Sequence, residues 1–387
     1  MHRWPLVLAL AGIAAVAVAQ EPSAVLTDFG GMAATTAPSG HAPHALGSRG
    51  RSLSAEARGA RDKGVDWLLK HQHRDGGWAS GNWGTTGTEA QSDVATTAFA
   101  VLALHRDAAG SGDHAQQLRS GVEFVIQAIE TAPEGPKLAT PEGTQIQYKL
   151  GPLVDTHLAS LMLGETLPSL PPSLQPRARR ALEKVVQKVQ QAQNADGSFD
   201  ANGWAPVLST SIAAQSLDSA ADLGVRVDRD VLAKSDEYQA GLSKSGGFDT
   251  TAGAGVELYA VASTLRNNQA TAGRAGPAAP TPEARREAKA AADAAAERVA
   301  AAPDAIISGF GSVGGEEMLS YMMISDTLAE KGGKEWTQWE SKIGAFLAQA
   351  QNADGSWVGH HCITSEAFAT AGGVLTLSAG DHAALEG

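Results

Sequence analysis

The feature that most constrains the fold is a turn that recurs three times along the chain. Each copy has a glutamine, a glycine four residues later, and an aromatic residue two positions after that glycine. Each copy also follows an amphipathic helical pattern, which an Asp-Gly pair ends because glycine supplies the positive φ that a tight turn needs. We therefore expect each turn to join two helices. The copies are Gln72 to Trp78, Gln193 to Phe199 and Gln351 to Trp357.

A second helical pattern, rich in alanine and other small residues, follows each turn, over 94–104, 207–223 and 364–377. Such helices are apolar nearly all round and must be buried on most sides, whereas the helices before the turns are more polar. Hairpins of this kind stack into a solenoid or close into a ring. With three weaker pairs, we expect an all-α fold of about six helical hairpins closed into an α/α toroid. The weaker pairs are 122–129 with 153–163, 232–242 with 254–265, and 283–299 with 318–328.

The turn resembles the QW motif of squalene–hopene cyclases and of the wider prenyltransferase and squalene-cyclase repeat superfamily. The resemblance covers the chain from about residue 55 onward, and the middle copy departs from it by having Phe199 instead of tryptophan. The resemblance implies a terpenoid cyclase-like α/α toroid with a central cavity, but it does not fix a reaction. The full copies are Lys63-Gly64-x-x-Trp67-Leu68-x-x-x-Gln72-x-x-x-Gly76-x-Trp78 and Gly344-x-Phe346-Leu347-x-x-x-Gln351-x-x-x-Gly355-x-Trp357.

The N-terminus has the pattern of a secretory signal peptide, which we predict over residues 1–19. A basic start is followed by an uncharged apolar run that ends in Ala17-Val18-Ala19. The run is short for a membrane span, and an uncleaved N-terminal anchor is the alternative. Residues 20–54, rich in Ala, Pro, Gly, Ser and Thr, predict a flexible linker before a toroid domain over 55–380. We therefore expect an exported protein, periplasmic or extracellular.

Composition narrows the classes of function. Hydrophobic residues make up 43% and charged residues 19%, which excludes a wholly disordered chain. The net charge of −12 argues against a nucleic-acid partner. No later segment is apolar enough for a stable membrane span after signal cleavage. The single cysteine, Cys362, excludes an intrachain disulfide and a multi-cysteine zinc finger.

The resemblance suggests acid chemistry, which the sequence supports poorly. Class II terpene cyclases protonate their substrate with an Asp-x-Asp-Asp cluster, whereas this chain has only Asp93 at the similar helix start. A lone carboxylate is a poor acid at neutral pH unless burial raises its pKa. Glu316 and Glu317 are the other catalytic candidates, and their alternative role is to stabilise a helix N-terminus. We do not expect a squalene-type cyclase.

A zinc site is the second chemistry that the resemblance suggests, because protein prenyltransferases hold zinc with Asp, Cys and His. Their Asp-x-Cys pair is absent here, but ligand-type residues lie where inner helices are expected to begin. In a closed ring they would meet at one mouth and complete a tetrahedron. The alternative is that the histidines line a solvent-exposed rim and that Cys362 is a small buried residue. Adjacent helical residues point about 100° apart, so His361 and Cys362 can face one metal only if they lie on the loop before the helix. The candidate ligands are Asp155, His157, His361 and Cys362, with His360 as a substitute.

The leading hypothesis is an exported toroid that binds an extended or apolar ligand, or another small molecule, in its central cavity. One alternative is a zinc-dependent enzyme, a transferase, lyase or hydrolase, with its site at the cavity rim. A second alternative is a protein-interaction module with an exposed patch on its outer helices. The sequence leaves open whether the protein is an enzyme.

Overall fold

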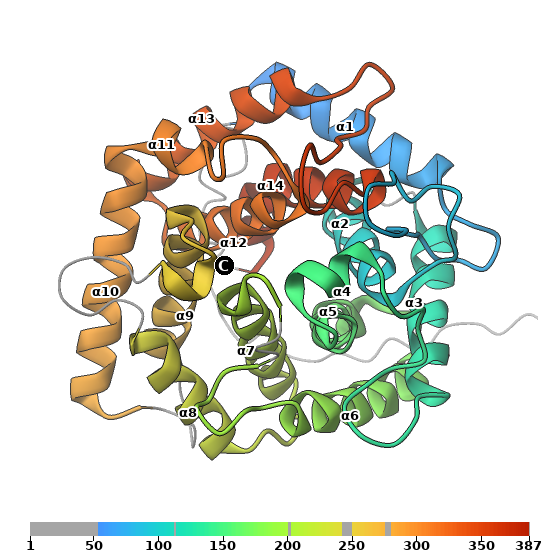
Figure 1. Ribbon diagram of the computed structural model, residues 1–387, viewed down its shortest axis with the longest axis horizontal. Helices are drawn as coiled ribbons and strands as arrows, with labels where there is room; N and C mark the ends of the chain where they lie inside the picture. Colours follow the sequence, from blue (N-terminus) through green and yellow to red (C-terminus); the bar gives the residue numbers. More distant parts are fainter. Residues whose placement is uncertain (1–52, 112–113, 200–202, 242–249, 275–279, 387) are drawn as a thin grey trace, which may run out of the picture. The chain divides into compact units, whose positions relative to one another are not determined.

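The computed structural model describes residues 53–111, 114–199, 203–241, 250–274 and 280–386 (Figure 1). All the described residues belong to one unit of the chain, Leu46–Gly387. The predicted signal peptide lies outside the described residues, as does the predicted linker up to residue 52. None of the helices in the described segments is both long and apolar enough to cross a membrane.

The described segments are helical and contain no β-strand, so the predicted all-α class is confirmed. Each of the six predicted hairpins is present as an outer helix followed by an inner helix, with ends that differ from the predicted ones by up to nine residues. The outer helices are α1 (Ala55–Lys70), α3 (Ala115–Glu130), α6 (Gln175–Gln191), α8 (Arg229–Ala240), α10 (Pro282–Ala301) and α13 (Gly333–Ala350). The inner helices are α2 (Val94–Ser111), α5 (Val154–Thr166), α7 (Pro206–Asp222), α9 (Glu257–Gly273), α12 (Gly315–Lys331) and α14 (Glu366–Glu386). The short elements are α4 (Gln145–Leu150), α11 (Pro303–Ile307), η2 (Leu167–Ser169) and η4 (Thr251–Gly253).

The two classes of helix differ in burial as their sequences predict. In α12 nearly every residue is buried, and the same holds for α5. In α6 the buried residues fall on one stripe that includes Ala178, Leu182, Val185 and Val189, while most of its arginines and lysines occupy the other face. A one-sided stripe packs against the inside of the molecule alone, which explains why such helices lie on the outside.

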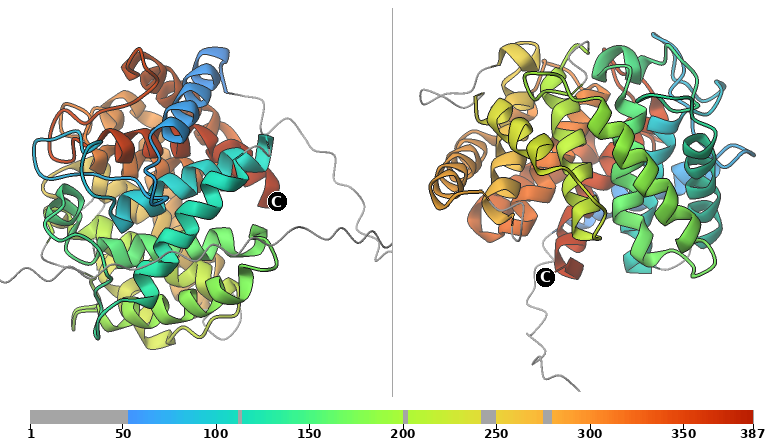
Figure 2. Two further views of the ribbon diagram at one scale, coloured as in Figure 1. Left: turned by 90° about the vertical axis from the view of Figure 1, so that its right-hand side faces the viewer. Right: turned by 90° about the horizontal axis from the view of Figure 1, so that it is seen from below.

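The inner helices pack side by side in an order that includes both ends of the described chain. Helix α2 packs on α5, α5 on α7, α7 on α9, α9 on α12, α12 on α14, and α14 on α2. Figure 1 shows these helices inside the outer ones, and Figure 2 shows them from two further sides. Among the outer helices, the first, α1, also packs on the last, α13. The first and last hairpins are therefore neighbours.

The aromatic residue of the turn motif anchors the helix that precedes it. Trp78 Nε1 donates a hydrogen bond of 3.0 Å to the carbonyl of Leu68, near the end of α1. Trp357 Nε1 donates in the same way, at 2.9 Å, to the carbonyl of Leu347 in α13. Both rings are buried. The indole thus adds a hydrogen bond to a carbonyl near the end of the preceding helix, which phenylalanine cannot do.

The glutamine of the motif joins its own turn to another outer helix. Its side-chain Nε2 donates to the carbonyl of the turn glycine and to a second carbonyl on a neighbouring helix. That second carbonyl belongs to Gln117 of α3 for Gln72 (2.9 Å), to Val231 of α8 for Gln193 (2.7 Å), and to Ala60 of α1 for Gln351 (2.7 Å). Two of the bonds connect an outer helix to the next, and the third connects the last to the first.

The turn glycine permits this close approach. Gly355 has φ +97°, and a Cβ added to it would lie 2.6 Å from the carbonyl oxygen of Lys63 in α1. Gly197 has φ +90°, and a Cβ added to it would overlap the carbonyl oxygen of Lys234 in α8. Each position therefore requires glycine both for its backbone conformation and for the space beside it.

Candidate functional site

The first turn of α12 carries two buried glutamates, Glu316 and Glu317, both predicted as catalytic candidates. Glu317 Oε1 accepts a hydrogen bond of 2.6 Å from the hydroxyl of Tyr259, and its Oε2 accepts one of 2.9 Å from the Gly314 N–H. Glu316 Oε2 accepts a bond of 3.3 Å from the Ile363 N–H, while its buried Oε1 has no partner. One glutamate therefore caps the helix, and the other keeps a free oxygen.

The environment of these glutamates changes their acidity. Burial, and after it the charge of Glu317, raises the pKa of Glu316 to about 7. Burial and Glu317 also raise the pKa of Tyr259, which keeps that hydroxyl protonated as a donor. Near neutral pH, Glu316 therefore exchanges a proton readily, which an exposed glutamate does only in acid.

The loop before α14 brings His361 and Cys362 to the same place. His361 Nε2 lies 2.8 Å from the carbonyl oxygen of Ser312 and 3.5 Å from Glu317 Oε2. Cys362 has φ +55°, a strained backbone conformation for a residue with a Cβ. Burial, and then Glu316, raises the pKa of the Cys362 thiol to about 11, so this sulfur is a neutral thiol at neutral pH.

Lys149, at the end of α4, is the cation of this group. Its charge lowers the pKa of the Cys362 thiol and that of Glu316, in both cases against the larger effect of burial. Its Nζ lies 4.5 Å from the ring centroid of Trp83 and 4.4 Å from that of Trp204, both cation–π contacts. We call the following residues the entrance cluster: Lys149, Tyr259, Glu316, Glu317, His361 and Cys362.

Four exposed aromatic side chains surround the entrance cluster. Trp83, Tyr148 and Trp204 contact the Lys149 ammonium, and the ring of Phe310 lies 5.2 Å from that of His361. They are 51% to 69% exposed, and they are the large exposed hydrophobic side chains of the described residues. We call them the aromatic rim. Their gathering at one end of the inner helices is unusual, because exposed apolar side chains are normally scattered.

Gln145, also on α4, holds this end together. Its Nε2 donates to carbonyls in the loop after the first turn motif, including Thr85 at 3.2 Å. Its Oε1 accepts hydrogen bonds from the backbone N–H groups of Thr364, at 2.5 Å, and Ser365, at 3.1 Å. One buried amide thus fixes loops of the first and last hairpins, and α4 then presents Lys149 between them.

Asp93 and Asp155 lie together, and their hydrogen bonds are made at the start of α2. Asp93 accepts hydrogen bonds from the N–H groups of Thr96, at 2.8 Å, and Ser80, at 2.7 Å. Asp155 accepts from the Ala95 N–H at 3.0 Å and from side chains nearby. Burial raises the pKa of both, that of Asp155 to about 7, and the charge of Asp93 adds to the effect on Asp155. Both carboxylates therefore cap α2.

The four predicted zinc ligands do not converge. His157 lies in the core, packed edge-on against Phe199 at 5.9 Å, with no hydrogen-bond partner on either ring nitrogen. Burial lowers its pKa to about 3, so it is a neutral core residue. Side chains two residues apart on a helix point about 200° apart, which separates the His157 ring from the Asp155 carboxylate. His360 is exposed on the loop. Across the described segments, no three His, Cys, Asp or Glu side chains are placed to hold a metal ion.

A cavity of about 860 Å³ lies at the opposite end of the inner helices. All six inner helices contribute to its wall, and we call it the central cavity. Its wall is charged and includes Arg106, Glu165, Asp218, Arg266 and Asp326. Such a wall suits a polar ligand better than the apolar ligand expected from the sequence.

Sequence reasoning missed Lys149 and the aromatic rim. A signal was present in the loops before inner helices: Trp83 lies beside Gly84 and Trp204 beside Gly203, and a large aromatic residue next to a turn former is exposed unless something covers it. Lys149 carried no such signal, because its burial depends on those same rings.

Comparison with protein-family models and with curated proteins found no match for this chain. Any assignment of function therefore depends on its turn motif, on the arrangement of its helices and on the residues gathered at their ends.

Proposed function

We propose that this chain is an exported α/α toroid of the prenyltransferase and squalene-cyclase repeat superfamily, and that it binds a ligand at the entrance cluster. The ligand has an extended or apolar body, which lies on the aromatic rim. It also has a hydrogen-bond-accepting or anionic head, which Lys149 and protonated Glu316 bind. The observation that carries this proposal is the exposed aromatic rim directly around a buried ammonium and a partnerless buried carboxyl oxygen.

Closure of the toroid is supported by contacts between the two ends of the repeat array. Gln351 donates to Ala60 of α1. The ring of Trp357 would lie 2.6 Å from a Cβ added at Gly64 of α1. The aromatic residue of the last motif therefore packs directly against a glycine of the first helix. At the entrance end, Gln145 links the first and last hairpins. An open solenoid would need none of these contacts.

The chemistry of the rim supports an apolar body rather than a fully polar ligand. Trp83 is 53% exposed and Trp204 51%, so each leaves about 100 Å² of ring surface for a ligand to cover. At about 25 cal/mol per Å², covering one ring contributes up to about 2.5 kcal/mol. The Lys149 ammonium between them then favours an anionic or accepting head.

The alternatives gain less support. A protein-interaction module was expected to expose its patch on the outer helices, whereas Trp83, Tyr148 and Trp204 lie on α4 and on loops. The hydrogen bonds of Asp93 favour a capping role over that of a squalene-cyclase acid. The zinc alternative requires His157, which lies in the core.

The test uses the fluorescent probe 1-anilinonaphthalene-8-sulfonate, which combines an aromatic body with an anionic head. We expect saturable binding that weakens about tenfold or more in Trp204→Ala, because the exposed half of a tryptophan surface is lost. Trp204→Phe is the matched control and should retain most of the affinity. Equal affinity in wild type, Trp204→Ala and Lys149→Met would refute binding at the entrance cluster.

Export is tested separately. Cell fractionation of the full chain and of a variant lacking residues 1–19 should place only the full chain outside the cytoplasm. Equal distribution of the two would contradict the export proposal.

A further inference from the structure

The central cavity lies at the far end of the inner helices from the entrance cluster, and two of the side chains that line it carry a buried oxygen without a hydrogen-bond partner. It has a volume of about 860 Å³, enough for a small organic molecule, and the C-terminal halves of the six inner helices line it. The entrance cluster and the aromatic rim contribute no residue to its wall. The polar side chains of this wall therefore form a separate environment.

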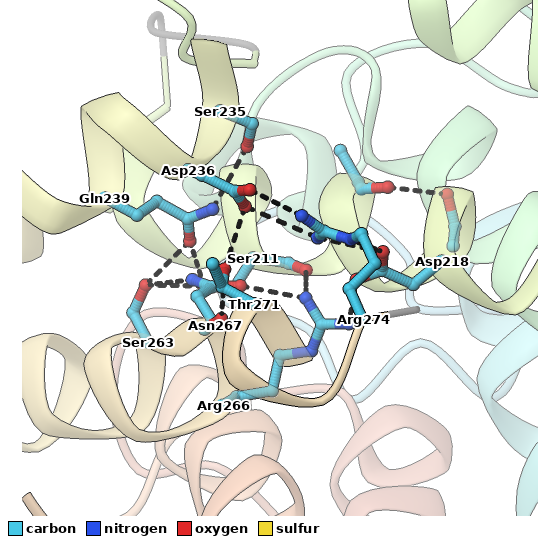
Figure 3. Close-up of polar contacts among 12 residues, drawn as sticks. Ser211, Asp218, Ser235, Asp236, Gln239, Ser263, Arg266, Asn267, Thr271 and Arg274 are labelled. Atoms are coloured by element: carbon cyan, nitrogen blue, oxygen red, sulfur yellow. Dashed lines mark hydrogen bonds and ion pairs between the residues drawn. The ribbon is translucent and has the colours of Figure 1, made fainter. Parts of the chain in front are cut away.

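The buried arginines of the wall are already occupied. Arg106 donates to both oxygens of Glu165, the nearer at 3.0 Å, and to Asp326 Oδ1 at 2.7 Å. Arg266 donates to Asp218 Oδ2 at 3.1 Å. Figure 3 shows Arg266 and Arg274 converging on Asp218, with Arg274 also bonded to Asp236. These guanidinium groups have carboxylate partners and do not require an anionic ligand.

The acceptors of the wall are not all occupied. Asp326 is 8% exposed, and its Oδ2 is buried without a hydrogen-bond partner. Gln215 Oε1, from α7, is also buried without a partner, and Gln215 lines the same cavity. A buried acceptor without a donor costs the full desolvation of that group, so each oxygen favours an occupant that carries N–H or O–H groups.

Two further features favour a positive charge in this cavity. The C-terminal halves of the inner helices surround it, and helix C-termini carry partial negative charge. Burial also raises the pKa of Asp326 to about 7 and that of Glu330 above its usual value. A bound cation would oppose both shifts, because a nearby positive charge favours the ionised form of a carboxyl group.

We propose that the central cavity binds a small organic cation, whose ammonium N–H groups donate to Asp326 Oδ2 and Gln215 Oε1. This site shares no residue with the entrance cluster, so a failure of ligand binding at one of the two sites does not imply a failure at the other. The occupant is of the class of primary amines and diamines, whose N–H donors match the two free acceptors and whose short carbon chain fits the remaining volume.

The experiment is isothermal titration calorimetry of the full chain with 1,4-diaminobutane as the probe. The neutral analogue 1,4-butanediol and sodium sulfate serve as comparison probes. The variants are Asp326→Asn, which replaces the free carboxylate oxygen by an uncharged amide of the same shape, and Gln215→Leu, which removes the second acceptor. Trp204→Ala is the matched control, because it changes the aromatic rim and leaves this cavity intact.

The diamine should bind saturably, and Asp326→Asn should weaken it about 10- to 100-fold, as expected for loss of one charge-assisted hydrogen bond. Gln215→Leu should weaken it less, and Trp204→Ala should leave it unchanged. Failure of the diamine to bind, equal binding of the diol, preferential binding of sulfate, or unchanged affinity in both cavity variants would each overturn the inference. Because Gln215→Leu leaves the Arg106 ion pairs intact, it still decides the question if Asp326→Asn does not fold.

Discussion

Replacing Gly355 by alanine should destabilise the protein more than a backbone effect alone explains. The turn has φ +97° there, and a side chain at such a φ costs about 1 to 2 kcal/mol. The added Cβ would also lie 2.6 Å from the carbonyl oxygen of Lys63 and 3.1 Å from its Cβ, contacts that the rigid backbone of α1 cannot relieve cheaply. Overpacking of this kind adds about 1 to 3 kcal/mol. We expect a total loss of about 3 kcal/mol in the free energy of unfolding.

Gly311→Ala is the matched control. Gly311 has φ +98°, but nothing lies within 4 Å of an added Cβ. Its substitution should therefore cost only the backbone effect, about 1 to 2 kcal/mol. Urea denaturation of both variants, followed by circular dichroism, measures the difference. If Gly355→Ala is no less stable than Gly311→Ala, the last turn does not lie against α1.

Other predictions concern buried charge. Arg106→Met should destabilise the protein by about 3 kcal/mol at pH 8, because Glu165 and Asp326 lose their partner in the core. The loss of stability should be smaller at pH 5, where Asp326 is protonated. Equal losses at both pH values would contradict this. Folding raises the pKa of Glu316 to about 7, so between about pH 5 and pH 7 the folded protein holds a proton that the unfolded chain has released. Relative to wild type, Glu316→Gln should therefore gain stability as pH rises through this window, by up to about 1.4 kcal/mol per pH unit in urea denaturation; a constant difference would exclude the raised pKa.

The helix pairs were predictable because their signals are local. The periodicity of α6 and the Asp-Gly turn before Phe199 depend on residues within a few positions of one another. The arrangement of inner and outer helices followed from the same pattern, since helices that are apolar all round have to be covered. Partners of the motif glutamine were not predictable, because Gln351 bonds Ala60, which lies 291 positions away.

The site was less predictable, for two reasons. The first is the direction in which helical side chains point. Asp155 and His157 are two residues apart, so they point in different directions, and only Asp155 faces the start of α2. Long-range assembly was the second. The charge of Lys149 acts on Cys362 only because Gln145 fixes α4 between loops of the first and last hairpins. Glu316 and Cys362 were recognised from their residue types, but their contact depends on a loop that no local pattern specifies.

The most direct test of closure is a disulfide between the first and last outer helices. A Cβ on Gly344 of α13 would lie 3.2 Å from the Ala57 Cβ of α1, close to the separation of about 3.5 to 4.5 Å in disulfides. In a Cys362→Ser background, Ala57→Cys with Gly344→Cys should form an intramolecular disulfide under mild oxidation, seen by non-reducing electrophoresis and peptide mass spectrometry. The pair Ala57→Cys with Arg180→Cys on α6 is the control and should remain reduced. If the 57–344 pair forms no more intramolecular disulfide than the control, the hairpins do not close on themselves and the central claim is wrong.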